Sequence, residues 1–152
     1  VCDVVPLIGL NRAIVKQGLK VLKAKKNLGL KTLIDICKIE ENPSIYHLGY
    51  ILGPKLNAPG RIGSSDLAIK LLCATSISEA TNLCDEIEEL NLKRKEIESI
   101  VRDEALEQVE RNQSESSIIW AAADGWHPGV VGIVASRLKD KFNKPSLVIG
   151  FD

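Results

Sequence analysis

A short apolar segment, a tight turn and an amphipathic segment follow one another near the end of the sequence. Residues 117–123 have the length and composition of a buried strand, and Asp124-Gly125 is a turn pair. Pro128 is favoured at the first position of a helix, where its missing N–H is not needed, and an apolar helical face continues to about residue 142. A second apolar run at 146–151 is expected to be a strand. Strand, helix and strand in this order predict a parallel pair, and therefore an α/β fold.

The start of the helix that opens at Pro128 has the features of an anion site. Free N–H groups and the positive end of the helix dipole attract anions there. Trp126 and His127 lie beside it in the sequence. Two interpretations of these side chains remain open. Trp126 is either a packing residue or a platform for a base, and His127 is either a helix cap or a functional group.

A long helix is expected over residues 76–112. Ser76 and Glu79 form a capping-box pattern at its start. Apolar residues mark one buried face in each half, but residues 91–96 are nearly all polar, which is typical of a helix that bridges two domains through solvent. Its basic turn at residues 93–95 is either a solvated face or a place where a single strand of nucleic acid could pass. A coiled coil is disfavoured because there are too few unbroken heptads.

Upstream of residue 76 the apolar spacing predicts short helices over 11–24, 30–39, 44–52 and 65–75. Asn11 is expected to cap the first of them. Residues 52–63 contain two prolines and three glycines, which predicts a rigid loop instead of regular structure. Lys55, Asn57 and Arg61 lie in this segment and are suited to holding phosphate or sugar oxygens. An ordinary surface connection is the alternative.

The composition is that of a soluble globular protein. Of the 152 residues, 45% are apolar and 26% are charged. Lys+Arg and Asp+Glu number 20 each, so no global positive field indicates a nucleic-acid ligand, although a local basic groove is compatible with neutrality. The 4 cysteines show neither a CxxC pair nor metal-ligand spacing and are expected to be reduced thiols.

The sequence carries no signal peptide and no apolar run long enough to span a bilayer, so we expect a cytoplasmic location without membrane association. It also contains no methionine, even at position 1. The chain is therefore expected to be a segment of a larger protein.

Thirteen consecutive residues, Gly125-Trp126-His127-Pro128-Gly129-Val130-Val131-Gly132-Ile133-Val134-Ala135-Ser136-Arg137, resemble a known signature. It is that of the RecJ family of bacterial single-strand-specific exonucleases, within the DHH phosphoesterase superfamily. Two other stretches resemble the same family in the same order. They are Asp3-Val4-Val5-Pro6-Leu7 with Asn11-Arg12, and Asn57-Ala58-Pro59-Gly60-Arg61. Pro59 stands where alanine is common in the family, and should stiffen the segment without removing the contacting groups.

The resemblance implies a domain order and an activity. Residues 1–75 would be the C-terminal helical part of a DHH catalytic domain, 76–112 a connecting helix, and 113–152 the start of a second α/β domain of the DHHA1 type. The implied activity is 5′-to-3′ degradation of single-stranded DNA in repair and recombination. Single-stranded DNA would be the substrate, with a single-strand-binding protein and a helicase as candidate partners.

The resemblance also implies site residues. Asp3 would be one ligand of a centre of two Mn²⁺ or Mg²⁺ ions, which activates a water and stabilises charge on the phosphodiester. Unaided by the resemblance, Asp3 is better interpreted as a capping or turn aspartate. The implied DNA contacts are Asn57, Arg61, His127, Ser136 and Arg137. Arg137 has a purely structural ion pair as its alternative role.

The family's Asp-His-His motif is absent, and the two histidines, His47 and His127, are far apart in the sequence. A single metal ligand cannot assemble a two-metal centre, so the 152-residue chain alone is expected to be inactive. Two other functions remain open. One is a superfamily phosphoesterase acting on oligonucleotides, cyclic dinucleotides or pyrophosphate. The other is a non-catalytic DNA-binding relative that has lost its metals.

Overall fold

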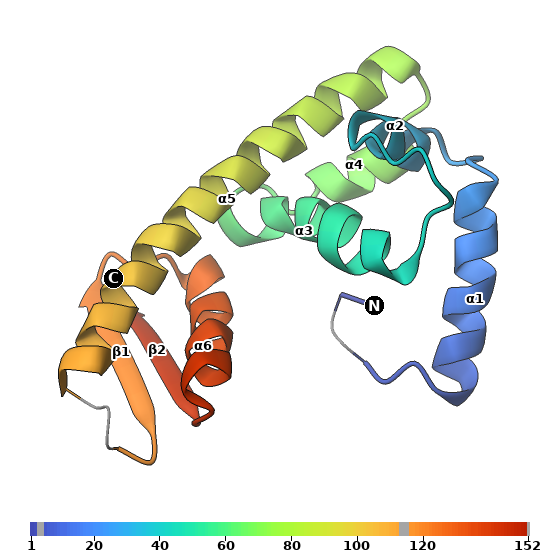
Figure 1. The fold of residues 1–152 in the computed structure, drawn as a ribbon. Helices are drawn as coiled ribbons and strands as arrows, with labels where there is room; N and C mark the ends of the chain where they lie inside the picture. Colours follow the sequence, from blue (N-terminus) through green and yellow to red (C-terminus); the bar gives the residue numbers. More distant parts are fainter. Residues whose placement is uncertain (3–4, 113–115, 152) are drawn as a thin grey trace. The chain divides into compact units, whose positions relative to one another are not determined.

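The computed structural model describes residues 1–2, 5–112 and 116–151 (Figure 1). Its elements are α1 (Gly9–Lys23), α2 (Leu28–Ile36), the π-helix η1 (His47–Leu52), α3 (Gly53–Ile62), α4 (Leu67–Cys73), α5 (Ile77–Asn112), β1 (Ile119–Asp124), α6 (Pro128–Phe142) and β2 (Ser146–Phe151). The chain divides into two compact units, Val1–Asn91 and Leu92–Asp152, so α5 contributes to both. Within the described residues, no helix is long and apolar enough to cross a membrane.

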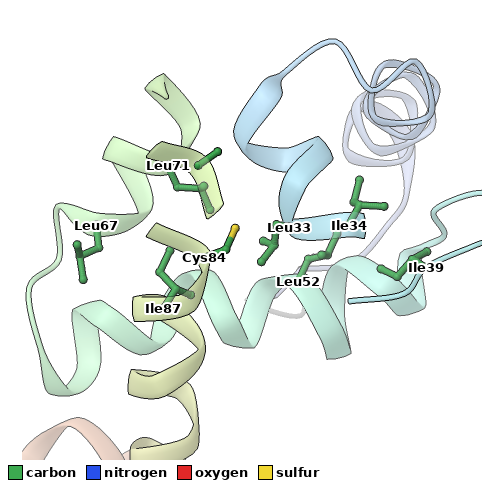
Figure 2. Close-up of a cluster of buried hydrophobic side chains, with 9 residues drawn as sticks. Leu33, Ile34, Ile39, Leu52, Leu67, Leu71, Cys84 and Ile87 are labelled. Carbon is green, nitrogen blue, oxygen red and sulfur yellow. The ribbon is translucent and has the colours of Figure 1, made fainter. Parts of the chain in front are cut away.

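The first unit is held together by a cluster of buried apolar side chains (Figure 2). Its members are Leu33, Ile34, Ile39, Leu52, Leu67, Leu71, Ala80, Cys84 and Ile87. Gly29 lets α2 approach α4 closely, because a Cβ at this position would lie 1.8 Å from the carbonyl oxygen of Leu71. In contrast, α1 buries no side chain, and its apolar Ile14 and Val21 are exposed.

The start of α5 confirms the serine half of the predicted capping box, whereas Glu79 bonds to the N–H of Thr75 and not to that of Ser76. The Glu79 backbone N–H donates to Ser76 Oγ over 3.2 Å, and the Glu79 carboxylate accepts from the Thr75 N–H over 3.0 Å. The helix then runs from Ile77 to Asn112. Local side-chain chemistry fixes the beginning of this element, which is why it could be placed from the sequence.

The prediction of an irregular loop over residues 52–63 is wrong, because α3 occupies most of it. Pro54 lies in the first turn of α3, where its fixed φ is already helical. Pro59 lies inside the helix, and it is fully buried beside Ala58, which is 0% exposed. Burial of these side chains outweighs the backbone hydrogen bond that Pro59 cannot donate.

Two helix starts also differ from the prediction. α1 begins at Gly9, and Asn11 lies within it instead of capping it; its side-chain amide donates to the Pro6 carbonyl over 3.1 Å. α2 begins at Leu28, with Asn27 as its cap accepting from the Leu30 N–H over 2.9 Å. Asparagine therefore caps the second helix and not the first.

In the second unit β1 and β2 pair in parallel, with Trp120 opposite Leu147, which confirms the predicted strand, helix and strand. α6 buries Val130, Val134 and Leu138. Gln108 on α5 covers the outer edge of β1, because its amide donates to the Ala122 carbonyl over 3.2 Å and accepts from the Ala122 N–H over 3.1 Å. This side chain satisfies edge groups of the strand as a further strand would.

The middle of α5 is less solvated than its polar sequence predicts. Asn91 is 1% exposed, and Arg94 and Glu98 are each 8% exposed. Arg94 forms an ion pair with Glu98 one turn later on the same helix. The ion pair offsets part of the cost of burying the two charges, and both side chains are buried where the sequence indicated a solvated face.

Candidate nucleic-acid interface

The side chain of His127 caps α6. Its Nδ1 accepts a hydrogen bond of 3.0 Å from the Gly129 N–H, and its carbonyl accepts from the Val130 N–H over 3.0 Å. Because Nδ1 is an acceptor, Nε2 carries the proton of the neutral ring. The cap interpretation of His127 is confirmed. The N–H groups of Gly129 and Val130 are bonded within the chain, so the group that His127 offers to an anion is its Nε2–H.

Trp126 is a packing residue. It is 4% exposed, and its indole Nε1–H donates to the Glu104 carboxylate over 2.6 Å. The backbone of Trp126 lies against Gly150 on β2, where a Cβ would come within 2.2 Å of the Trp126 carbonyl oxygen. The buried indole ties the turn before α6 to α5 and presents no face on which a base could stack.

Ser136 and Arg137 are exposed neighbours on α6. They lie more than two turns beyond His127, about 14 Å along the axis at 1.5 Å per residue. Arg137 Nε lies 3.6 Å from Glu98 Oε1, with the arginine side chain 64% exposed. The structure therefore places Arg137 in an ion pair but leaves most of its side chain at the surface. It does not bring Arg137 and His127 together.

Asn57 and Arg61 are exposed one turn apart on α3. A helix places residues of this spacing on the same face, so the amide and the guanidinium share one surface. Lys55, from the same segment, instead forms an ion pair with Glu88 on α5 and is only 16% exposed. Of the three polar side chains that the sequence associates with phosphate, two thus lie together at the surface and one is a structural partner of α5.

Asp3, the candidate metal ligand, lies outside the described residues. Among residues 1–2, 5–112 and 116–151, no group of three or more His, Cys, Asp or Glu side chains is arranged to hold a metal ion.

One surface feature is not marked by any of the sequence motifs. Tyr46 and Tyr50 are 60% and 74% exposed, and their rings stack with centroids 5.3 Å apart and an interplanar angle of 28°. These are the 2 tyrosines of the chain. Their spacing of four residues in a predicted helix is the signal from which the pair could have been found.

Comparison with known proteins relates the chain to one kind of nuclease, although no protein-family model matches it. The single-stranded-DNA-specific exonuclease RecJ of Bacillus subtilis is 43% identical over 100% of this chain, which spans 20% of that protein. The corresponding protein of Escherichia coli is 39% identical over 99% of this chain, which spans 27% of it.

Two solved structures agree with these sequence relationships. RecJ from Thermus thermophilus in complex with Mg²⁺ matches 99% of this chain, with a TM-score of 0.90 and 31% identity; the chain covers 24% of it. An exonuclease RecJ bound to manganese matches 98% of the chain, with a TM-score of 0.81 and 30% identity; the chain covers 37% of it. The fold is thus that of a segment of a single-strand-specific exonuclease.

The particular relationship is to RecJ, and the expectation drawn from residues 125–137 is confirmed. The chain is a RecJ-like sequence from end to end. It spans 20% to 28% of the length of the curated relatives it matches.

Proposed function

We propose that this chain works as part of a longer, metal-dependent exonuclease that removes nucleotides from the 5′ end of single-stranded DNA. The observation that carries the proposal is the match to RecJ proteins over the whole chain, in sequence and in fold. On this proposal residues 1–75 belong to a DHH catalytic domain, 76–112 form the connecting helix, and 113–152 begin a DHHA1-type domain.

The surface of the second unit supports the view that further polypeptide completes it. Trp120, Leu147, Ile149 and Phe151 are 52%, 57%, 43% and 51% exposed. Parallel sheets are almost always covered on both faces, and two strands alone rarely make a stable sheet. In the complete exonuclease, additional elements would cover these apolar side chains.

The proposed metal centre needs ligands from beyond the described residues. Solved RecJ structures are complexes with Mg²⁺ or Mn²⁺. We assign one ligand to Asp3, on its match to the family segment, and expect the others from the rest of the longer polypeptide. The 152-residue chain by itself should therefore be inactive. The longer protein would act in the cytoplasm, in repair and recombination, with a single-strand-binding protein and a helicase as partners.

The chain's own residues would hold the DNA backbone. The Arg61 guanidinium can donate two hydrogen bonds to one phosphate, and the Asn57 amide can donate beside it. From the second unit, the His127 Nε2–H, the Ser136 hydroxyl and the Arg137 guanidinium are the proposed donors. These groups bind phosphate and sugar without reading a base, which suits an enzyme that degrades DNA of any sequence.

The test compares the full-length polypeptide that contains this chain with its Asp3→Ala variant. Both are incubated with Mn²⁺ and with single-stranded DNA labelled at either end, and mononucleotide release is followed. Asp140→Ala is the matched control, because it removes a 64% exposed carboxylate that pairs with Lys139 on α6. We expect release from the 5′ end by wild type and control, and its loss in Asp3→Ala.

Each other outcome points to a different function. Release from the 3′ end would contradict the proposed polarity. Preference for very short oligonucleotides or cyclic dinucleotides would favour another phosphoesterase of the superfamily. DNA binding without degradation in all three proteins would favour a non-catalytic relative.

A further inference from the structure

The stacked pair of tyrosines at the start of η1 is an exposed aromatic surface. Tyr50 lies within η1 and Tyr46 immediately precedes it, and the i→i+5 bonding of a π-helix places residues of this spacing almost above one another. Each ring leaves more than half of its surface to solvent. Two parallel aromatic faces at a surface are suited to stacking with a further flat ring.

The segment that carries Tyr46 is fixed by the buried side chain of His47. His47 is 6% exposed, and its Nδ1 accepts a hydrogen bond of 3.0 Å from the Ser44 N–H. Its Nε2 lies 3.2 Å from the Glu41 carboxylate. The Tyr46 and His47 rings also pack edge to face, with centroids 5.8 Å apart at 75°. An aromatic surface ordered in this way loses little conformational entropy when a ligand binds.

The tyrosines and the proposed phosphate contacts belong to one continuous helical run, and all of them are exposed. η1 passes directly into α3, and Asn57 follows Tyr50 by seven residues, with Arg61 one α-helical turn later. All four side chains are exposed, whereas Leu52, Gly53, Ala58 and Pro59 between them are buried. We call this exposed row of Tyr46, Tyr50, Asn57 and Arg61 the tyrosine–arginine stripe. From Tyr50 to Arg61 it is about 16 Å long at 1.5 Å per residue.

We propose that the tyrosine–arginine stripe binds single-stranded DNA, with bases stacking on Tyr46 and Tyr50 while Asn57 and Arg61 hold the backbone. This inference rests on the proposed function and adds a base-stacking site to it. The occupant is a single strand because the bases of a duplex already stack on each other, whereas an unpaired base has a free face for an aromatic ring. A row that joins aromatic faces to an amide and a cation matches the alternating bases and phosphates of one strand.

The experiment measures DNA binding by the full-length polypeptide in EDTA, so that the DNA stays intact. The probe is a fluorescein-labelled single-stranded oligonucleotide, titrated at several salt concentrations and followed by anisotropy. A second oligonucleotide carries 2-aminopurine, whose fluorescence falls when it stacks. The main variant is Tyr46→Leu with Tyr50→Leu, which keeps the apolar bulk and removes the rings. The matched variant Tyr46→Phe with Tyr50→Phe keeps the rings.

We expect the double leucine variant to bind the single strand about tenfold more weakly and to lose the 2-aminopurine quenching. The slope of log K against log salt should not change, because no phosphate contact is removed. The double phenylalanine variant should bind as wild type does. Ile69→Ala, which truncates a 64% exposed apolar side chain on α4, controls for loss of surface area and should also bind normally.

Arg61→Gln distinguishes a failure of the proposed stacking site from a failure of the proposed function. It should weaken binding and reduce the salt slope by about one unit, since one phosphate contact is lost. If Arg61→Gln behaves in this way but the double leucine variant binds like wild type, the stacking site is refuted and the proposed function stands. If the wild-type protein does not bind the single strand at all, both proposals fall. Circular dichroism verifies that every variant is folded. If the double leucine variant does not fold, the single variant Tyr50→Leu is used in its place.

Discussion

The indole N–H of Trp126 donates a 2.6 Å hydrogen bond to the carboxylate of Glu104, and so joins the turn before α6 to the C-terminal half of α5. Trp126 is 4% exposed, whereas the acceptor Glu104 is an exposed residue, so only the indole side of the bond is buried. The most recognisable stretch of the sequence therefore begins with a structural contact. Of the proposed DNA-binding groups of the second unit, His127 directly follows Trp126, and Ser136 and Arg137 lie further along α6.

The Trp126–Glu104 bond should contribute to stability. Trp126→Phe removes the donor and part of the buried ring, and should lower the free energy of unfolding by about 2 kcal/mol, the scale of a hydrogen bond to a charged group. Glu104→Gln keeps an acceptor oxygen and should cost less. Urea unfolding followed by circular dichroism, with the double variant included, gives the coupling energy. A coupling energy of zero would show that the two side chains are merely neighbours.

The two proposed roles of His127 can be separated by substitution. His127→Ala removes the cap of α6 and should lower the free energy of unfolding by about 1 kcal/mol. His127→Asn keeps a side-chain oxygen able to accept from the Gly129 N–H, so it should retain stability while losing the Nε2–H donor. If His127 also contacts DNA, the asparagine variant should be as stable as wild type but bind single-stranded DNA more weakly. Unchanged binding would leave His127 with its structural role alone.

Glu98 and Arg137 should differ sharply in their effect on stability. Glu98→Gln removes the charge of a buried carboxylate that pairs with the buried Arg94 guanidinium, and should lower the free energy of unfolding by about 3 kcal/mol. Arg137→Ala breaks a 3.6 Å pair of a 64% exposed side chain and should cost less than about 1 kcal/mol. Thermal unfolding of the two variants tests this order. Equal losses of stability in the two variants would contradict this order, because the exposed Arg137–Glu98 pair would then account for the whole effect of Glu98.

Elements with strong local signals were predictable from the sequence. The Ser76–Glu79 capping box gave the start of α5, and Pro128 gave the first residue of α6. Both signals depend on hydrogen bonds or backbone angles of residues within one turn, so they act wherever the segment finally packs.

Features that depend on tertiary packing were not predictable. Proline and glycine signals in residues 52–63 favour a loop, but burial of Ala58 and Pro59 makes the segment helical. Arg94 belongs to a polar run but is buried, and it pairs with Glu98 one turn later. The tyrosine–arginine stripe needed the structure for the same reason, since a helix through residues 53–62 is what continues the helical run from Tyr50 to Asn57 and Arg61.

Two glycines in helices should respond in opposite ways to alanine. Gly29→Ala would place a Cβ 1.8 Å from the Leu71 carbonyl oxygen, a backbone atom that cannot move without separating α2 from α4. A loss of about 3 kcal/mol or more in the free energy of unfolding is expected, as for other severe overpacking. Gly18→Ala in α1 is the matched control. Nothing lies within 4 Å of the added methyl group, so it should stabilise the chain by about 0.5–1 kcal/mol.

The cysteines should differ in reactivity because their burial differs. Burial raises the pKa of the Cys84 thiol to about 11, whereas Cys2 and Cys73 are exposed. Since the thiolate is the nucleophile, iodoacetamide at about pH 8 should modify Cys2 and Cys73 first and Cys84 only after unfolding.

The raised pKa of Cys84 also means that its neutral thiol is favoured in the folded state. The contribution of Cys84 to the free energy of unfolding is therefore fully present below the ordinary cysteine pKa. It declines as the pH rises towards 11. Mass spectrometry of peptides after timed labelling tests the order, with Cys84→Ala as the control. Rapid labelling of Cys84 in the folded chain would contradict its burial between α5 and the rest of the first unit's apolar cluster.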